Sequence, residues 1–283
     1  TADIVAYVDI NSCPQILENN KQYNKTYKNN LKIGGYKLFL DGSPQGKTAW
    51  MTQPYENSGD YCGYPIYGDK QVQDFVKKAI VEQQQLLCHC NGDAAAQQFI
   101  DAYETLDKRL ETTENFRPVL IHGQLATPAQ MSQLKPLGMI ASFFVAHTWR
   151  WGDIHIENFG ERAMNICPVN TALDNDVIIT FHQDSPVLPP DMMHTVWCAV
   201  NRITQNGIML EQKEAISVYD ALKSITINAA YQYGEENTKG TIEIGKDASF
   251  VILSDNPLLC DKKEINKIKV IQTILRNEIV FKL

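Results

Sequence analysis

The sequence feature that most constrains the fold is a polar side chain that recurs where an apolar segment ends and a helical segment begins. Residues 86–93 read LLCHCNGD, an apolar run that contains His89 and closes in an Asn-Gly turn before the alanine-rich segment Asp93–Leu106. Similar apolar runs end at His122, in RPVLIHG, and at Asp184, in FHQDSP. Parallel α/β proteins place their chemistry at the carboxyl ends of strands. The recurrence therefore predicts strands that alternate with helices and share one functional end.

The order of predicted elements favours a barrel. Six strand candidates precede Gly240 and alternate with helices, and these are Ile4–Ile10, Tyr36–Leu40, the run from Leu86, Arg117–Gly123, Met139–Val145 and the strand from Asp176. An open sheet that binds a dinucleotide should carry a glycine-rich phosphate loop, and neither GxGxxG nor Walker A is present. Since about eight strands close a (β/α)8 TIM barrel, the six predict a partial one. After Gly240 the chain becomes β-rich, which predicts a small β unit.

Composition limits the partners. The 283-residue chain has 33 acidic and 26 basic residues, a net charge of -7 and no basic stripe, which argues against nucleic acid or an anionic membrane as partner. No apolar run approaches the roughly eighteen residues of a membrane span, and no signal peptide is visible. The seven cysteines are irregularly spaced, which suits reduced thiols and a cytoplasmic location. The chain begins with Thr1, so we expect a processed or truncated piece.

The Cys-His-Cys triplet around His89 is not predicted to be a single metal site. Side chains alternate between the two faces of a strand, so Cys88 and Cys90 should point away from His89. The two cysteines are then packing residues. The chemistry of His89 must come from side chains on other strands.

Four polar side chains on other strands occur in the chain in the order in which a barrel would present them to one mouth. Lys37 lies in the strand before His89, His122 ends the next strand, and Asp184 follows the last one, with His182 two residues earlier on the same face. Nitrogen and oxygen ligands of this kind suit a divalent cation such as zinc. A metal there would activate water, with a carboxylate nearby to move protons.

At this point the chain resembles the YtcJ-like branch of the amidohydrolase superfamily. The matching stretches are spread over nearly the whole chain in the family's order, and they are YKLFLDGSPQGKTAW from Tyr36, HCNGDAA from His89, RPVLIHGQ from Arg117, residues 147–163, DSPV from Asp184 and GTIEIGKDASFVIL from Gly240. The resemblance implies a distorted TIM barrel over residues 1–239, holding about strands three to eight, and part of a small β-sandwich over residues 240–283. It also implies hydrolysis of C–N bonds of a small-molecule substrate.

The resemblance carries roles over to single residues. His89, His122, Asp184 and Lys37 match metal ligands, for one or two zinc ions, and Lys37 matches a lysine that is carboxylated in some relatives. Asp184 also matches the catalytic aspartate, which moves a proton to and from the attacking water. The alternative that Lys37 is uncarboxylated and pairs with an acidic residue stays open.

The loop expected at residues 147–159 offers further candidates. His147 and Trp149 are expected at the barrel mouth, where with His182 they would contact substrate, although an aromatic loop that merely covers the barrel fits as well. Arg162 is expected to pair with Glu157 or Glu161 rather than with a substrate carboxylate.

Two departures keep other functions open. The family's first strand carries a His-x-His pair, which none of the six histidines here forms, and Ser249 stands where the sandwich motif has Asp. A partial barrel that lacks this pair could be a catalytically inactive scaffold or binding protein. A metal-independent barrel hydrolase or lyase that uses His182 and Asp184 is a third alternative. Exposed strand edges would favour a homo-oligomer.

Overall fold

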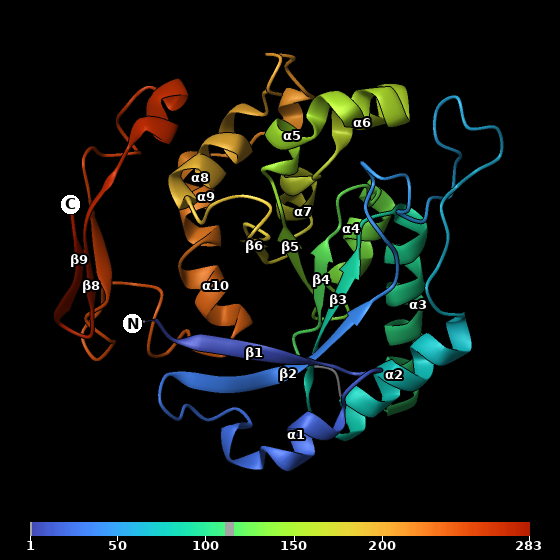
Figure 1. The fold of residues 1–283 in the computed structure, drawn as a ribbon, viewed down its shortest axis with the longest axis horizontal. Coiled ribbons are helices and arrows are strands. Elements are labelled where there is room, and N and C mark those ends of the chain that lie inside the picture. The colour runs from blue at the N-terminus through green and yellow to red at the C-terminus, as the bar shows by residue number, and fades with distance from the viewer. Residues whose placement is uncertain (1, 111–115) are drawn as a thin grey trace.

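The computed structural model describes residues 2–110 and 116–283, and these form an α/β fold with two separate sheets (Figure 1). The larger sheet is parallel, with its six strands in chain order, β1 (Ile4–Asp9), β2 (Leu31–Phe39), β3 (Gln85–Cys90), β4 (Val119–His122), β5 (Ile140–Phe143) and β6 (Ile179–Phe181). The helices that connect the strands are α1 (Gln15–Asn19), α2 (Asp69–Val81), α3 (Asp93–Leu110), α4 (Pro128–Leu134), α5 (His147–Arg150), α6 (Gly152–Phe159) and α7 (Val169–Asp174). The alternation predicted from the sequence is confirmed, and all strand carboxyl ends therefore lie at one edge.

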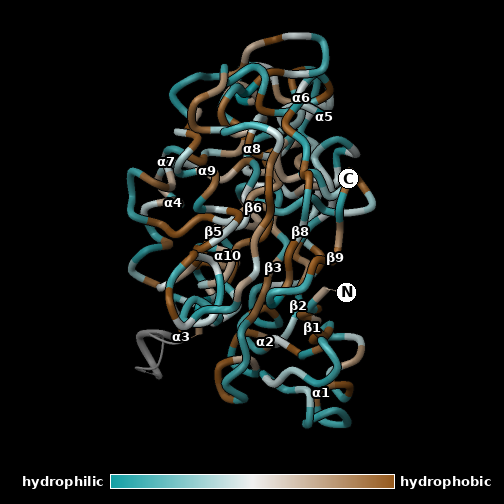
Figure 2. The backbone as a smooth tube through the Cα atoms, turned by 90° about the vertical axis from the view of Figure 1, so that its left-hand side faces the viewer, coloured by the Kyte–Doolittle hydropathy of each residue, from teal (hydrophilic) through white to brown (hydrophobic). Residues whose placement is uncertain are grey.

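The two faces of the parallel sheet differ in how they are covered. Cys88 and Cys90 of β3 are fully buried in the main core, together with Val76 of α2 and Phe99 of α3. Residues of the other register face the opposite side and form a smaller cluster made of Leu87, Val119 and Ile140. The prediction that the two cysteines are packing residues on the face opposite to His89 agrees with this burial. In the hydropathy view the brown, apolar segments run along the strands (Figure 2).

The turn after β3 is held by a buried carboxylate. Asp41, which follows β2, accepts backbone N–H groups of Asn91 at 2.9 Å, Gly92 at 2.7 Å and Trp50 at 3.0 Å. A Cβ at Gly92 would lie 1.9 Å from the Trp50 carbonyl oxygen, so only glycine allows this close approach. Asp41 therefore ties Trp50, within the long segment 42–67, to the turn after β3.

Two helices begin at capping side chains. Thr127 caps α4 in a capping box with Gln130, and Ser217 caps α9 (Val218–Ser224). The loop expected at residues 147–159 is instead α5 and α6, because the aromatic side chains of this segment pack inward. Phe159, for example, is 1% exposed.

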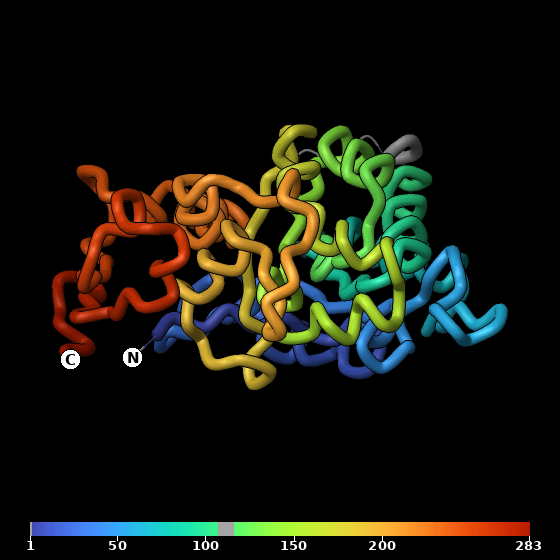
Figure 3. Tube along the Cα trace, turned by 90° about the horizontal axis from the view of Figure 1, so that it is seen from above, coloured from blue at the N-terminus to red at the C-terminus, as the bar shows by residue number. Residues whose placement is uncertain are grey.

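The remaining chain adds helices and the second sheet. Helices α8 (Met192–Asn201), α9 and α10 (Ile227–Gln232) follow β6, and the antiparallel sheet consists of β7 (Phe250–Leu253), β8 (Val270–Leu275) and β9 (Glu278–Lys282). This sheet lies at one end of the molecule, and the segment around residue 60 lies at the other (Figure 3). Among the described residues no helix combines the length and the hydropathy needed to cross a membrane.

A network of charges joins the two sheets. Asp3, just before β1, accepts from Lys239 at 2.7 Å and from Arg276, in the turn between β8 and β9, at 2.5 Å. Glu235 bonds Lys239 at 2.8 Å and also bonds Lys32 of β2. We call these five residues the charge network.

Candidate metal centre

Three side chains from the carboxyl ends of β4 and β6 meet at one point. His122, His182 and Asp184 each offer a ligand atom, and these atoms all lie within 4.8 Å of one another. His122 is the last residue of β4, while His182 and Asp184 lie one and three residues after the end of β6 at Phe181. With His89 and Lys37 on the adjacent strands, we call these five residues the strand-end cluster.

The direction of His122 depends on its backbone. In the ladder His122 stands opposite Cys90, so regular alternation would turn it toward the helices, as Cys90 is. Its φ of 73° breaks the extended conformation at this residue. Its ring centre then lies 4.5 Å from that of His89 and 4.9 Å from that of His182.

His182 is held from both sides. Its Nε2 lies 3.3 Å from Nδ1 of His122, and its Nδ1 lies 3.1 Å from the hydroxyl of Ser142. Ser142 belongs to β5 and His122 to β4, so the two contacts of His182 link the ends of three neighbouring strands. The ring of Phe144 stacks on His182 at 5.8 Å.

His89 is oriented through one of its ring nitrogens. Nε2 lies 3.0 Å from the Asn91 amide nitrogen, 3.3 Å from the Gly42 carbonyl oxygen and 3.6 Å from Oδ1 of Asp41. Contacts of this kind fix the ring orientation of metal-binding histidines in proteins. His89 does not belong to the group of ligand atoms, from His122, His182 and Asp184, that lie within 4.8 Å of one another.

Burial holds the histidines of the strand-end cluster in the neutral form. Burial and the nearby cation of Lys37 lower the pKa of His89 to about 4 and that of His182 to about 3. Burial and the neighbouring histidines place the pKa of His122 well below its ordinary value. Metals bind neutral imidazole, so the protonation state fits a metal centre.

Lys37 and Asp184 are shifted toward their neutral forms as well. Burial lowers the pKa of Lys37, whose ammonium lies 4.9 Å from the ring centre of Phe39. Desolvation raises the pKa of Asp184, although solvent reaches this carboxylate and Lys37 partly opposes the shift. The raised pKa suits the Asp184 carboxylate to accepting a proton, and the lowered pKa makes it easier for Lys37 to lose a proton and bind a metal.

Of the residues predicted to contact substrate in the segment 147–159, His147 lies near the strand-end cluster and Trp149 does not. His147 lies near the cluster, with its ring centre 5.9 Å from that of His122, and its Nδ1 lies 3.3 Å from Nε2 of His155. Trp149 points elsewhere and packs edge-on against His194 of α8 at 4.7 Å. Arg162 does not pair with Glu157 or Glu161 and instead donates to the backbone carbonyls of residues 53, 54 and 159.

The structure adds residues that the sequence did not single out for the site. Asp41 is not among the predicted site residues, yet it holds the loop that positions His89. Ser142 and His155 support His182 and His147, and only their places in the folded chain reveal this. For His182 the signal was present in the sequence, since the spacing of two residues to Asp184 puts both at the same strand end.

The fold and the strand-end cluster are consistent with one family of enzymes. A family model described as "Amidohydrolase family" matches residues 5–281, so the chain belongs to this family, and the resemblance predicted from the motifs is confirmed.

Individual relatives agree with this assignment. The chain is 25% identical over 258 residues to "Putative amidohydrolase YtcJ" of Bacillus subtilis, covering 89% of this chain and 47% of that protein. It is 27% identical over 245 residues to "N-substituted formamide deformylase" of Arthrobacter pascens, covering 86% and 44%. A solved structure of an uncharacterized metal-dependent hydrolase from Pyrococcus horikoshii superimposes with a TM-score of 0.78 at 25% identity, covering 92% of this chain and 52% of that one. The chain thus spans about half the length of these relatives.

Proposed function

We propose that this chain is the metal-binding portion of a hydrolase that cleaves the C–N bond of a small amide-type substrate. The observation that carries the proposal is the meeting of His122, His182 and Asp184 within 4.8 Å. The family membership and the name of the Arthrobacter relative, a formamide deformylase, support the bond type. The sheet would then be part of a TIM barrel, over residues 1–239, and residues 240–283 part of a β-sandwich.

The residues present fit a divalent cation such as zinc. Their donors are imidazole nitrogen and carboxylate oxygen, and the imidazoles are neutral. We propose His89, His122 and Asp184 as ligands, with Lys37 beside them, free or carboxylated. The sequence assigns His182 to substrate, and its place in the cluster makes it a further ligand candidate.

The chain's own groups would handle the protons and the substrate. A metal bound there supplies a Lewis acid that activates water and polarises a carbonyl group. Asp184 accepts a proton from the attacking water, for which its raised pKa suits it, and returns the proton to the leaving nitrogen. His147 is buried beside the strand-end cluster. It would contact the carbonyl group of the substrate, in a part of the site from which water is excluded.

Metal content tests the proposal. The full-length natural protein, purified without added chelator, should carry close to one or two equivalents of metal, and less than about a tenth of an equivalent contradicts the proposal. His89→Asn and Asp184→Asn should both lower metal content and hydrolysis of formamides and related amides. His194→Asn is the matched control, because His194 lies on α8 against Trp149 and Trp197, away from the cluster.

A second function is favoured by one observation. None of the six histidines forms the His-x-His pair that the family carries on its first strand. A full-length protein that also lacks such a pair and holds no metal would be a scaffold or binding protein instead. If hydrolysis is lost in Asp184→Asn but kept in His89→Asn and in metal-free protein, the metal-independent mechanism holds.

A further inference from the structure

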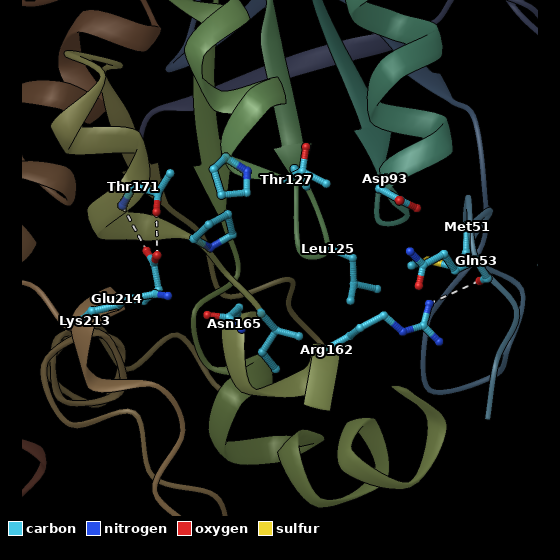
Figure 4. Close-up of a pocket in the computed structure, with 14 residues that line it drawn as sticks. Met51, Gln53, Asp93, Leu125, Thr127, Arg162, Asn165, Thr171, Lys213 and Glu214 are labelled. Carbon is cyan, nitrogen blue, oxygen red and sulfur yellow. Dashed lines mark hydrogen bonds between the residues drawn. The ribbon is translucent and has the colours of Figure 1, made fainter. Parts of the chain in front are cut away.

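The cavity of about 490 Å³ that Figure 4 shows lies apart from the strand-end cluster. It is lined by residues such as Leu125 and Ala126 of the loop after β4, and by Arg162 and Ile166. No member of the strand-end cluster lines it. Recognition of a substrate at the proposed metal centre therefore depends on side chains that stand beside the cluster itself.

Phe39, the last residue of β2, is such a side chain. In the parallel ladder Phe39 is paired with His89, and the ring centres of the two residues lie 5.3 Å apart. The ammonium of Lys37, two residues earlier, lies 4.9 Å from the centre of the Phe39 ring. Leu38, between them, is 1% exposed and packs in the main core. Since side chains alternate along a strand, Phe39 shares a face of the sheet with Lys37 and His89.

The ring of Phe39 has a free surface. Phe39 is 42% exposed, whereas Phe144, which stacks on His182, is 1% exposed. Single exposed apolar side chains are common in proteins. Phe39 differs from most of them in its position, because its ring adjoins a proposed metal ligand at the carboxyl end of a strand. A ligand that covers this ring would remove apolar surface from water.

The aromatic rings contact one another in series, with Phe39 at one end. Phe39 contacts His89, the ring centre of His89 lies 4.5 Å from that of His122, and His182 follows at 4.9 Å from His122. Asp184 groups with His122 and His182, at the other end of the series. In the proposed reaction Asp184 returns a proton to the leaving nitrogen, so the nitrogen lies at that end. The acyl group of the substrate then extends toward His89 and Phe39.

We propose that Phe39 contacts the acyl group of the substrate and that the site selects amides whose acyl group is an alkyl chain or an aromatic ring. Alkyl and aromatic groups gain dispersion contacts on the face or edge of a phenyl ring, and they need no hydrogen-bond partner there. Phe39 acts as a specificity residue and takes no part in proton transfer. The inference rests on the proposed hydrolysis, because the position of the leaving nitrogen at Asp184 orients the substrate.

Two isomeric amides test the proposal on the metal-loaded, full-length natural protein. N-methylhexanamide carries its alkyl chain on the acyl carbon, and N-hexylformamide carries it on the nitrogen. Phe39→Ala should lower the ratio of kcat/KM for N-methylhexanamide to kcat/KM for N-hexylformamide about tenfold, because the acyl chain alone loses its contact. Phe39→Leu keeps an apolar side chain and should lower this ratio less than about threefold.

Binding without turnover separates this inference from the proposed hydrolysis. Titration calorimetry of metal-depleted protein with N-methylhexanamide at pH 7 should show binding that Phe39→Ala weakens about tenfold. If the natural protein hydrolyses neither isomer but shows this binding, the proposed hydrolysis fails and the contact of Phe39 with the acyl chain is supported. If hydrolysis occurs and the ratio does not depend on Phe39, the inference alone fails.

Phe281→Ala is the matched control. Phe281 is 45% exposed and lies on β9 in the antiparallel sheet, outside the strand-end cluster. This variant should leave the ratio of the two kcat/KM values unchanged. Equal losses for both isomers in Phe39→Ala would show that Phe39 acts through His89 or Lys37, and a larger loss for N-hexylformamide would place the nitrogen substituent at Phe39. Either result overturns the proposal.

Discussion

The strand-end cluster and the charge network differ in the charge state that the fold favours for their titratable groups. In the charge network each charge has a partner: Lys32, 9% exposed in its side chain, bonds Glu235, and Asp3 bonds Lys239 and Arg276. In the strand-end cluster, Lys37 and three histidines are buried together, and desolvation pushes all of them toward the neutral form.

The difference shows what each region does for the protein. Burial would raise the pKa of Glu235, but hydrogen bonds from Lys239 and Lys32 lower it, so the folded state stabilises the carboxylate. In the strand-end cluster, the attraction between Lys37 and Asp184 only partly opposes the effect of desolvation on these two groups. Polar groups brought together at this cost are typical of a functional site, whose missing partner is a ligand.

The largest effect is expected at Asp184. Asp184→Asn removes a ligand and the proton acceptor, so hydrolysis by the full-length protein should fall about 100- to 1,000-fold. Steady-state rates on formamide-type substrates measure this, and circular dichroism should show an unchanged fold, because Asp184 is exposed. If the variant kept the full rate, the strand-end cluster would not be the catalytic site.

Asp41 tests whether the support of His89 matters. Asp41→Asn keeps the size of the side chain but weakens the contacts to Asn91 and Gly92, so metal affinity should fall about 10- to 100-fold. Competition with a chromophoric chelator measures the affinity. The matched variant Asp153→Asn alters another carboxylate, one that bonds Thr204, and should leave affinity unchanged.

The charge network should respond in stability and not in metal binding. Glu235→Gln leaves Lys32 buried and without its anionic partner, so the free energy of unfolding should fall by about 2 kcal/mol. Urea denaturation at pH 7 measures it. Asp74→Asn is the matched control, since Lys70 and Asp74 are 81% and 59% exposed, and it should cost less than about 0.5 kcal/mol. If both variants lost the same free energy of unfolding, the buried ion pair would contribute no more to stability than the exposed one.

An effect of similar size should appear in the pH dependence of stability. Burial lowers the pKa of His155, which is fully buried, to about 3, against roughly 6.5 in the unfolded chain. Between these values only the unfolded state takes up the proton, so stability falls as pH falls below about 6.5. His155→Gln should reduce the loss between pH 7 and pH 5 by about 2 kcal/mol. Glu235, with its lowered pKa, should act only at lower pH, near and below its unfolded value. If His155→Gln shows the same pH slope as the natural protein, His155 is protonated in the fold.

Much of the fold could be predicted because its signals are local. Apolar runs such as the one at Leu86 fit buried parallel strands, and Thr127 with Pro128 marks a helix start. The helices at residues 147–159 were missed, since their stability comes from packing of side chains such as Phe159 rather than from a helical pattern. The support given by Asp41 could not be predicted either, because its partners lie 9 to 51 residues away.

The sequence by itself determined the order of the strands, the strands on or after which Lys37, His89, His122 and Asp184 occur, and the family. It could do so because strand period and turn chemistry act over a few residues. Only the tertiary structure decided that His122 turns toward the cluster through a φ of 73°, that His182 joins it, and that Trp149 points away. These outcomes depend on packing between segments far apart in the chain, where burial, rather than local pattern, sets direction and charge state.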